Sequence, residues 1–289
     1  MHLFGNPKWI SKELLALKSI EEIPGDFLKQ LGEDINNMVS ATPEVSICLV
    51  AWNEELNIIR CLDSLRNSKS RVPFEIVIVN NNSKDSTGEI IEKIGIKSYF
   101  QPIQGCGVSR ELAQQKARGK YVICADADCL YHPEYIDKMY QALSKPGVVA
   151  AYSKYSFLSD GNGARLKYFL YDIIKDLLLE IRHFKRPYLN AYGMCFAYIR
   201  EYGIKEGFAL RNMGGSDGRM CFDLMKYGKV QAERSSRSRV WTSARNLQRD
   251  GSFGSAVKKR VKTELGRFMA YSRETVPHDT KRSSNRDLF

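Results

Sequence analysis

The sequence lacks the features of membrane-spanning, secreted and repeat-built proteins. It has no run of about eighteen uncharged apolar residues, which excludes a transmembrane helix. The first eleven residues contain no apolar stretch of signal-peptide length, so we expect a protein that stays in the cytoplasm. No segment repeats at a fixed period. With 289 residues, 43% hydrophobic and 27% charged, the chain can form one large globular domain or two small ones.

The seven cysteines show no sign of a disulfide framework. Their number is odd, no two are spaced as C-x-x-C, and several lie inside apolar runs. A free cysteine in such a run behaves as a small hydrophobic residue. We therefore expect a reducing compartment and no disulfide bonds.

Two common phosphate-binding motifs are also missing. The first apolar run ends without a glycine, so it carries no dinucleotide fingerprint, and the Walker pattern Gly-Lys-Ser/Thr is absent. A glycine-rich stretch does occur at Gly105-Cys106-Gly107, and it precedes a predicted helix that contains Arg110. A helix N-terminus beside an arginine favours an anion, although this stretch alone is weak support for a site.

The chain has a formal net charge of +11, and residues 232–273 are especially rich in arginine and lysine. Such an excess suits polyanionic partners such as nucleotides or phospholipid head groups, and a solvated basic surface explains the same pattern. A nucleic-acid-binding protein is less favoured, because the basic residues do not alternate with an aromatic platform.

The first half of the chain alternates strands with helices. Apolar runs predict buried strands at residues 45–51, 74–79, 96–100, 121–125 and 148–152, and helices follow at 54–65, 85–94, 109–117 and 134–143. We expect Asn53 to cap the first of these helices. The alternation predicts an α/β fold with a mostly parallel sheet covered by helices, preceded by a helical N-terminal extension.

Two amphipathic helices are expected in the second half. Residues 166–184 carry an apolar stripe, with charged residues on the other face, and residues 255–271 form a basic amphipathic pattern. Both stripes could pack on the sheet or on each other, with the charges facing water. Alternatively, the C-terminal helix could lie on the inner face of an anionic membrane.

Polar segments follow three of the predicted strands, at Trp52-Asn53-Glu54, Asn80-Asn81-Asn82-Ser83 and Asp126-Ala127-Asp128. Ligands of parallel sheets bind beyond the carboxyl ends of the strands, so these segments predict a site. An isolated Asp-x-Asp is typical of a solvated turn. At the tip of an apolar strand, however, two carboxylates suit Mg²⁺ or Mn²⁺, which can also bridge a diphosphate.

Taken in order, these segments resemble glycosyltransferase family 2, whose members are inverting sugar transferases with a GT-A fold. The resemblance rests on residues 45–55, 76–87, 107–110 and 126–128 and covers about residues 44–250. It implies a GT-A domain over 44–250, divided into a nucleotide-binding half (44–152) and an acceptor half (153–250). A helical extension (1–43) precedes this domain, and a basic helix and tail (251–289) follow it.

The resemblance also implies a role for individual residues. Those assigned to a nucleotide-sugar donor are Trp52, Asn53 and Glu54 beside the base and ribose, Asn80 and Asn82 after the second strand, Arg110 facing the base or diphosphate, Asp126 at the ribose and Arg245 at the phosphates. Asp128 would hold Mg²⁺ or Mn²⁺. Asp217, which follows Gly214-Gly215-Ser216, would be the catalytic base, and a helix cap is its other interpretation.

Three positions depart from the family pattern: Asn80 replaces an aspartate, Glu111 replaces an asparagine, and Ser216 replaces an acidic residue. The favoured function is transfer from a UDP-sugar to a glycan or lipid-linked acceptor, in the cytoplasm or at the inner membrane face. One alternative is a catalytically silent GT-A domain that binds nucleotide or acidic polymer. Another is a sugar-nucleotide pyrophosphorylase, which needs a glycine-rich first loop that this chain lacks.

Overall fold

The computed structural model describes residues 5–159, 164–210 and 215–244. Their main sheet has seven strands, in the spatial order β3 (Ser98–Phe100), β2 (Phe74–Asn80), β1 (Val45–Ala51), β4 (Tyr121–Asp126), β8 (Phe196–Ile199), β6 (Val148–Ser153) and β9 (Lys229–Glu233). A smaller sheet contains β5 (Cys129–Leu130), β10 (Val240–Thr242) and β7 (Tyr155–Phe157).

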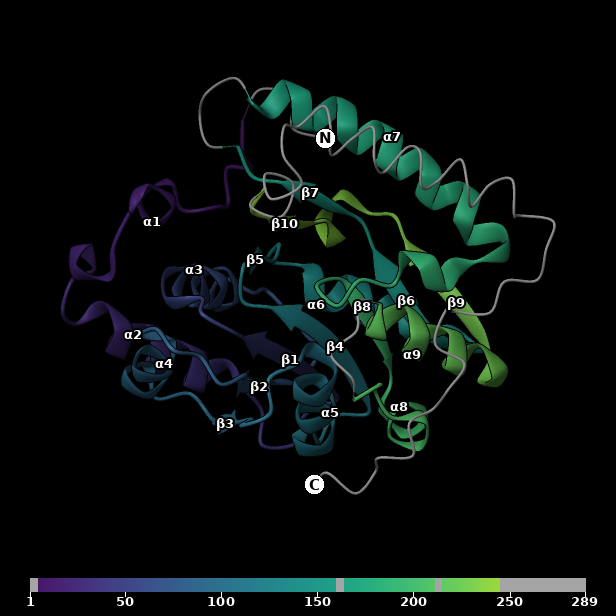
Figure 1. The fold of residues 1–289 in the computed structure, drawn as a ribbon, viewed down its shortest axis with the longest axis horizontal. Helices are drawn as coiled ribbons and strands as arrows, with labels where there is room; N and C mark the ends of the chain where they lie inside the picture. Colours follow the sequence, from purple (N-terminus) through teal and green to yellow (C-terminus); the bar gives the residue numbers. More distant parts are fainter. Residues whose placement is uncertain (1–4, 160–163, 211–214, 245–289) are drawn as a thin grey trace.

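Helices surround the main sheet (Figure 1). The α-helices are α1 (Lys12–Ala16), α2 (Phe27–Met38), α3 (Glu55–Arg66), α4 (Thr87–Ile94), α5 (Cys106–Lys116), α6 (Tyr135–Leu143), α7 (Ala164–Lys185), α8 (Arg200–Glu206) and α9 (Ser216–Leu224). Short 3-10 turns are η1 (Ile20–Glu22), η2 (Pro187–Asn190), η3 (Met225–Tyr227) and η4 (Ser236–Ser238).

The prediction of a mostly parallel sheet is confirmed. Strand β1 pairs in parallel with β2 and with β4, and β6 pairs in parallel with β9. The exception is β8, which lies between β4 and β6 and is antiparallel to both. This strand joins the first half of the chain to the second within one sheet.

The core occupies both faces of the main sheet, because successive side chains of a strand point to opposite faces. On one face, Ile47 and Ile78 pack with α2, α3, α4 and α6. On the other face, Cys48 and Val77 pack with α5 and α9. Strands buried on both faces are continuous apolar runs, which explains why β1 and β2 could be located from the sequence.

Helix α7 lies along one side of the molecule, above β7 and β10 in the view of Figure 1, and it turns its charged face inward. Asp172, Lys175 and Asp176 are at most 9% exposed, whereas Leu170 and Leu177 are more than half exposed. The interpretation in which the apolar stripe packs on the sheet and the charges face water is therefore wrong for this helix. Within the described residues, no helix is both long and apolar enough to cross a bilayer.

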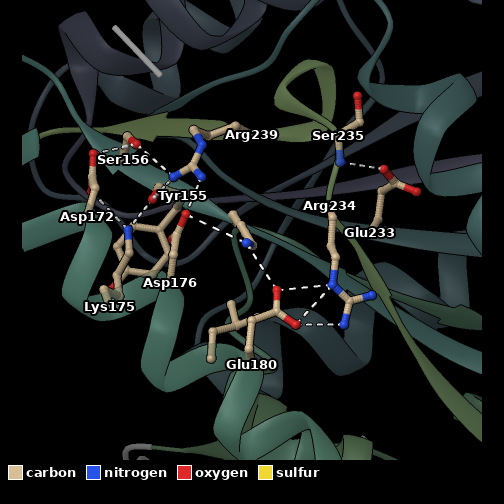
Figure 2. Close-up of polar contacts among 12 residues, drawn as sticks. Tyr155, Ser156, Asp172, Lys175, Asp176, Glu180, Glu233, Arg234, Ser235 and Arg239 are labelled. Atoms are coloured by element: carbon tan, nitrogen blue, oxygen red, sulfur yellow. Dashed lines mark hydrogen bonds and ion pairs between the residues drawn. The ribbon is translucent and has the colours of Figure 1, made fainter. Parts of the chain in front are cut away.

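Ion pairs beneath α7 explain its orientation (Figure 2). The fully buried Asp172 accepts hydrogen bonds from Ser156 Oγ at 2.7 Å, Arg165 Nη2 at 2.9 Å and Lys175 Nζ at 3.1 Å. Burial lowers the pKa of Lys175, and Asp172 acts in the opposite direction. Buried charges are tolerated when they are paired and hydrogen-bonded, and this cluster meets that requirement.

A second carboxylate one turn further along continues the cluster. Asp176 pairs with Arg239, which comes from the segment before β10. Asp176 Oδ2 also lies 3.8 Å from Lys154 Nζ. Lys154 also pairs with Glu180 at 3.1 Å, and the half-exposed Arg234 binds Glu180 at 2.7 Å. The network therefore runs from the buried side of α7 to its solvent edge.

The inverted orientation of α7 can be tested by unfolding in urea. Asp172→Ala should lower the free energy of unfolding by about 3–5 kcal/mol, because it leaves Arg165 and Lys175 buried without this partner. The control Ile204→Ala, at an exposed apolar position on α8, should alter it by no more than about 0.5 kcal/mol. An Asp172→Ala variant as stable as this control would mean that the ion cluster does not hold the inner face of α7.

Candidate active site

Three strand ends meet at one edge of the main sheet. Ala51 of β1 is paired with Asn80 of β2, and Val50 is paired with Asp126 of β4. The polar segments that follow these strands therefore begin side by side, as the sequence predicts.

The loop after β1 is held to the loop after β2. Asn53 has a φ of 53°, its Oδ1 accepts from the backbone N–H of Lys84 at 2.7 Å, and its own N–H donates to Ser83 Oγ at 3.0 Å. The prediction that Asn53 caps α3 is wrong, because its side chain binds the neighbouring loop and Glu54 occupies the cap position. Trp52 leaves its side chain 46% exposed beside this junction.

Asn80 and Asn82 shape the loop after β2. Asn80 Oδ1 accepts from the N–H of Ser83 at 3.0 Å, and Asn82, with a φ of 54°, donates from Nδ2 to the Pro102 carbonyl at 3.0 Å. Asparagine tolerates this left-handed conformation better than most residues. An amide oxygen has two lone pairs, so Asn80 keeps the capacity to accept one more hydrogen bond.

Arg110 lies beneath the site, only 3% exposed. Its Nη2 donates to Asp126 Oδ1 at 2.8 Å, its Nε lies 2.8 Å from Asp217 Oδ1, and its Nη1 donates to the Gly193 carbonyl at 3.4 Å. The Nε contact has the distance of an ion pair but not the alignment of a hydrogen bond. Burial opposes the charge of Arg110, but Asp126 and Asp217 raise its pKa well above the ordinary value, so it remains a cation.

Asp217 stands in the first turn of α9, with its side chain 16% exposed. Its Oδ2 accepts from the backbone N–H of Gly193 at 3.0 Å. Burial raises the pKa of Asp217, Arg110 lowers it, and Asp126 raises it again, so the net shift is upward. A carboxylate held by two partners, with a raised pKa and some exposure, has the properties of a general base.

Asp126 and Asp128 flank the buried Ala127 at the end of β4. The Asp126 side chain is 34% exposed, and the Asp128 carbonyl accepts from Thr242 Oγ1 at 3.4 Å. Mg²⁺ is usually held by one or two carboxylates together with water and substrate phosphates, and this pair fits that description. Among the residues that the structure describes, no group of three histidine, cysteine or acidic side chains could hold a metal ion. The remaining ligands would therefore have to come from substrate and solvent.

Sequence reasoning missed Gly193, and it named Asn81 within a polar segment without assigning it a role. The backbone carbonyl of Gly193 accepts from Arg110, and its N–H donates to Asp217. Contacts made by the backbone cannot be predicted from a sequence pattern. The buried Asn81 accepts from the N–H of Gly105 at 3.1 Å, which ties the start of α5 to the end of β2. Arg245, predicted to bind phosphate, lies outside the described residues.

A family model described as "Glycosyl transferase family 2" matches residues 46–205. Among curated proteins, the putative glycosyltransferase EpsH of Bacillus subtilis is 35% identical over 103 residues, which is 34% of this chain. The matched region spans 30% of the length of EpsH.

Solved structures share the fold at low identity. A mannosyltransferase from Pyrobaculum calidifontis, in complex with GDP-Man and Mn²⁺, has a TM-score of 0.54 and 16% identity, and the match covers 88% of this chain and 70% of that one. Residues 1–349 of TarS from S. aureus, in complex with UDP-GlcNAc, also have a TM-score of 0.54, with 17% identity and coverage of 69% and 58%. Identity at this level establishes the fold alone.

The contact between Gly193 and Arg110 leaves no room for a side chain. A Cβ at position 193 would lie 1.7 Å from Arg110 Nη2, and the ion-paired guanidinium has no solvent to move into. Gly193→Ala should therefore lower the free energy of unfolding by about 3 kcal/mol or more, as breaking a buried ion pair does. Gly25→Ala, where a Cβ meets nothing within 4 Å, should change it by no more than about 0.5 kcal/mol. Equal unfolding midpoints for the two variants would contradict this packing.

Proposed function

The chain belongs to glycosyl transferase family 2 and is a glycosyltransferase, and we propose that it transfers a sugar with inversion from a UDP-sugar to a hydroxyl group of a glycan or lipid-linked acceptor. The observation that carries this proposal is the position of Asp217. It shares the buried Arg110 with Asp126, a residue at the strand edge where nucleotides bind in such sheets. This arrangement supports a base next to the expected donor.

The donor would lie across the ends of β1, β2 and β4. The exposed indole of Trp52 offers a surface for the base, and the remaining acceptor capacity of Asn80 suits an N–H of the base. Binding of UDP-GlcNAc by the TarS structure and of GDP-Man by the Pyrobaculum enzyme supports a nucleotide-sugar donor. We favour UDP, as expected from the sequence.

Asp128, with Asp126 beside it, would hold Mg²⁺ or Mn²⁺. When bound, such an ion neutralises the charge that develops on a diphosphate leaving group. The presence of Mn²⁺ in the complex of the Pyrobaculum mannosyltransferase supports this assignment.

Asp217 would take the proton from the acceptor hydroxyl as that oxygen attacks the anomeric carbon. The new carbon–oxygen bond forms while the bond to the diphosphate breaks, and the diphosphate leaves with the electron pair. One displacement inverts the configuration, so one carboxylate base suffices. Ser216, which stands where the family has a second acidic residue, would not be required, because Arg110 and the Gly193 N–H already orient Asp217.

Metal dependence provides the first test of this proposal. Asp128→Asn should weaken the Mn²⁺-dependent affinity for UDP at least about tenfold in calorimetry, because a neutral amide is a poorer ligand for a hard cation. The variant should remain folded, since a partly exposed residue at a strand end contributes no more than about 1 kcal/mol. Asp34→Asn, on the remote helix α2, serves as the control. If wild-type UDP affinity is the same with Mn²⁺ and with chelator, no metal takes part.

The role of Asp217 provides the second test. Asp217→Asn should leave UDP affinity within about twofold of wild type while turnover falls by roughly 10²–10⁴-fold. Asp223→Asn is a matched control, because Asp223 lies on the same helix, is also 16% exposed and is also paired with an arginine. Transfer at near wild-type rate by Asp217→Asn would show that Asp217 is not the base, and would leave it as an acidic residue in the first turn of α9.

The pH profile follows from the same residue. Because burial raises the pKa of Asp217, and the base must be ionised, turnover should fall as the pH drops through a value above that of an exposed aspartate. This acid limb of kcat should be missing from the residual activity of Asp217→Asn and present in Asp223→Asn. An acid limb that persists in Asp217→Asn would assign it to another group.

A further inference from the structure

The outward face of α7 is apolar along the whole helix. Its exposed residues range from 44% exposure for Ile173 to 84% for Phe184, and they are Leu166, Leu170, Ile173, Ile174, Leu177 and Phe184. Each lies three, four or seven residues from another, so together they form one stripe. The stripe is about 27 Å long, at 1.5 Å per residue. A monomer rarely leaves so continuous an apolar surface in contact with water.

The helix cannot hide this stripe by rotating about its axis. Rotation would break the contact of Asp172 with Ser156 and the pairing of Asp176 with Arg239 (Figure 2). It would also break the ion pair between Asp172 and Arg165. Separating a buried ion pair costs several kcal/mol, so the charged face stays inward. Any cover for the stripe must come from outside the described residues.

The chain itself continues from a point beside α7. Strand β10 pairs in parallel with β7, the strand that leads into α7, and the guanidinium of Arg165 lies 4.8 Å from the centre of the Trp241 ring. The described part of the chain ends two residues after this strand, at Ala244, and residues 245–289 continue from there.

These following residues contain a matching pattern. Phe253, Val257, Val261, Leu265 and Phe268 are spaced by four, four, four and three residues, which places them on one face of a helix. A helix over 255–271 would be about 25 Å long, comparable with the stripe on α7. On such a helix Lys259 and Lys262 would point away from that face, and Lys258 and Arg260 would flank it.

We propose that residues 253–271 form an amphipathic helix that docks its apolar face on the exposed stripe of α7. This contact removes from water both the stripe of α7 and the apolar face of the docked helix. The tether gives the segment an effective concentration in the millimolar range, which favours it over a second copy of the chain in dilute solution. This inference concerns packing alone and is independent of the proposed reaction.

Hydrogen exchange of the full chain, followed by mass spectrometry, tests the docking. In wild type at low concentration, amides of 255–271 should exchange at least tenfold more slowly than in the double variant Leu170→Asp/Leu177→Asp, which places charge on the stripe. Ile204→Asp, at a 41%-exposed position on α8, is the matched control and should keep the protection. Fast exchange of these amides in wild type, or unchanged protection in the double variant, would overturn the proposal.

A second double variant, in the segment itself, shows whether a loss of protection in the first double variant is only due to misfolding of α7. Val261→Asp/Leu265→Asp changes only the segment and should also abolish its protection, while Lys262→Asp, on the opposite face of that helix, should not. Two further outcomes would each overturn the proposal in favour of another occupant. Protection that rises with protein concentration and dimer mass would indicate a second copy. Protection that appears only with vesicles containing phosphatidylglycerol would indicate a membrane surface.

Discussion

The buried guanidinium of Arg110 holds together three segments that are distant in the sequence. It pairs with Asp126 at the end of β4 and with Asp217 at the start of α9, and it donates to the carbonyl of Gly193. Removing a cation from water is costly unless opposite charges compensate, and two carboxylates brought close together repel each other unless a cation lies between them. Each charge offsets the desolvation cost of burying the others. The end of β4 and the candidate base are consequently fixed relative to one another by one side chain.

The sequence predicted the first half of the fold well because its signals are local. Strands such as β1 and β2 are continuous apolar runs, and their polar ends converge because parallel strands share an edge. The same reasoning identified Asp126 and Asp128 as candidates for the site, whereas Asp217 was suggested by the family resemblance alone. It did not reveal that Arg110 joins two of them, because that contact depends on Gly193, 83 residues further along the chain. The role of Asn53 was missed for a similar reason, since its partner lies in the loop after β2.

Helix α7 shows a different limit of sequence reasoning. An amphipathic pattern divides a helix into an apolar face and a charged face, but it does not state which face is turned to the protein. Here the decision rests on partners supplied by other elements, among them Ser156 of β7 and Arg239 before β10. Burial of apolar surface alone would favour the opposite orientation. The paired ion cluster stabilises the observed orientation more strongly, and its partners lie outside residues 164–185, so the sequence of the helix cannot predict which face is buried.

The position of β8 has a consequence for how the chain reaches this structure. The main sheet places β8 between β4 and β6, although β8 is made after both. Until residues 196–199 arrive, β4 and β6 each present an open edge with unpaired backbone groups, which other chains can bind. Pairings between distant segments form slowly, because the intervening loop must first be closed. A nascent chain that has just released β6 from the ribosome therefore exposes both of these edges. Strand β8 can fill the gap only after about fifty further residues have been synthesised, which takes a few seconds to ten seconds at typical rates, and β9 follows later still.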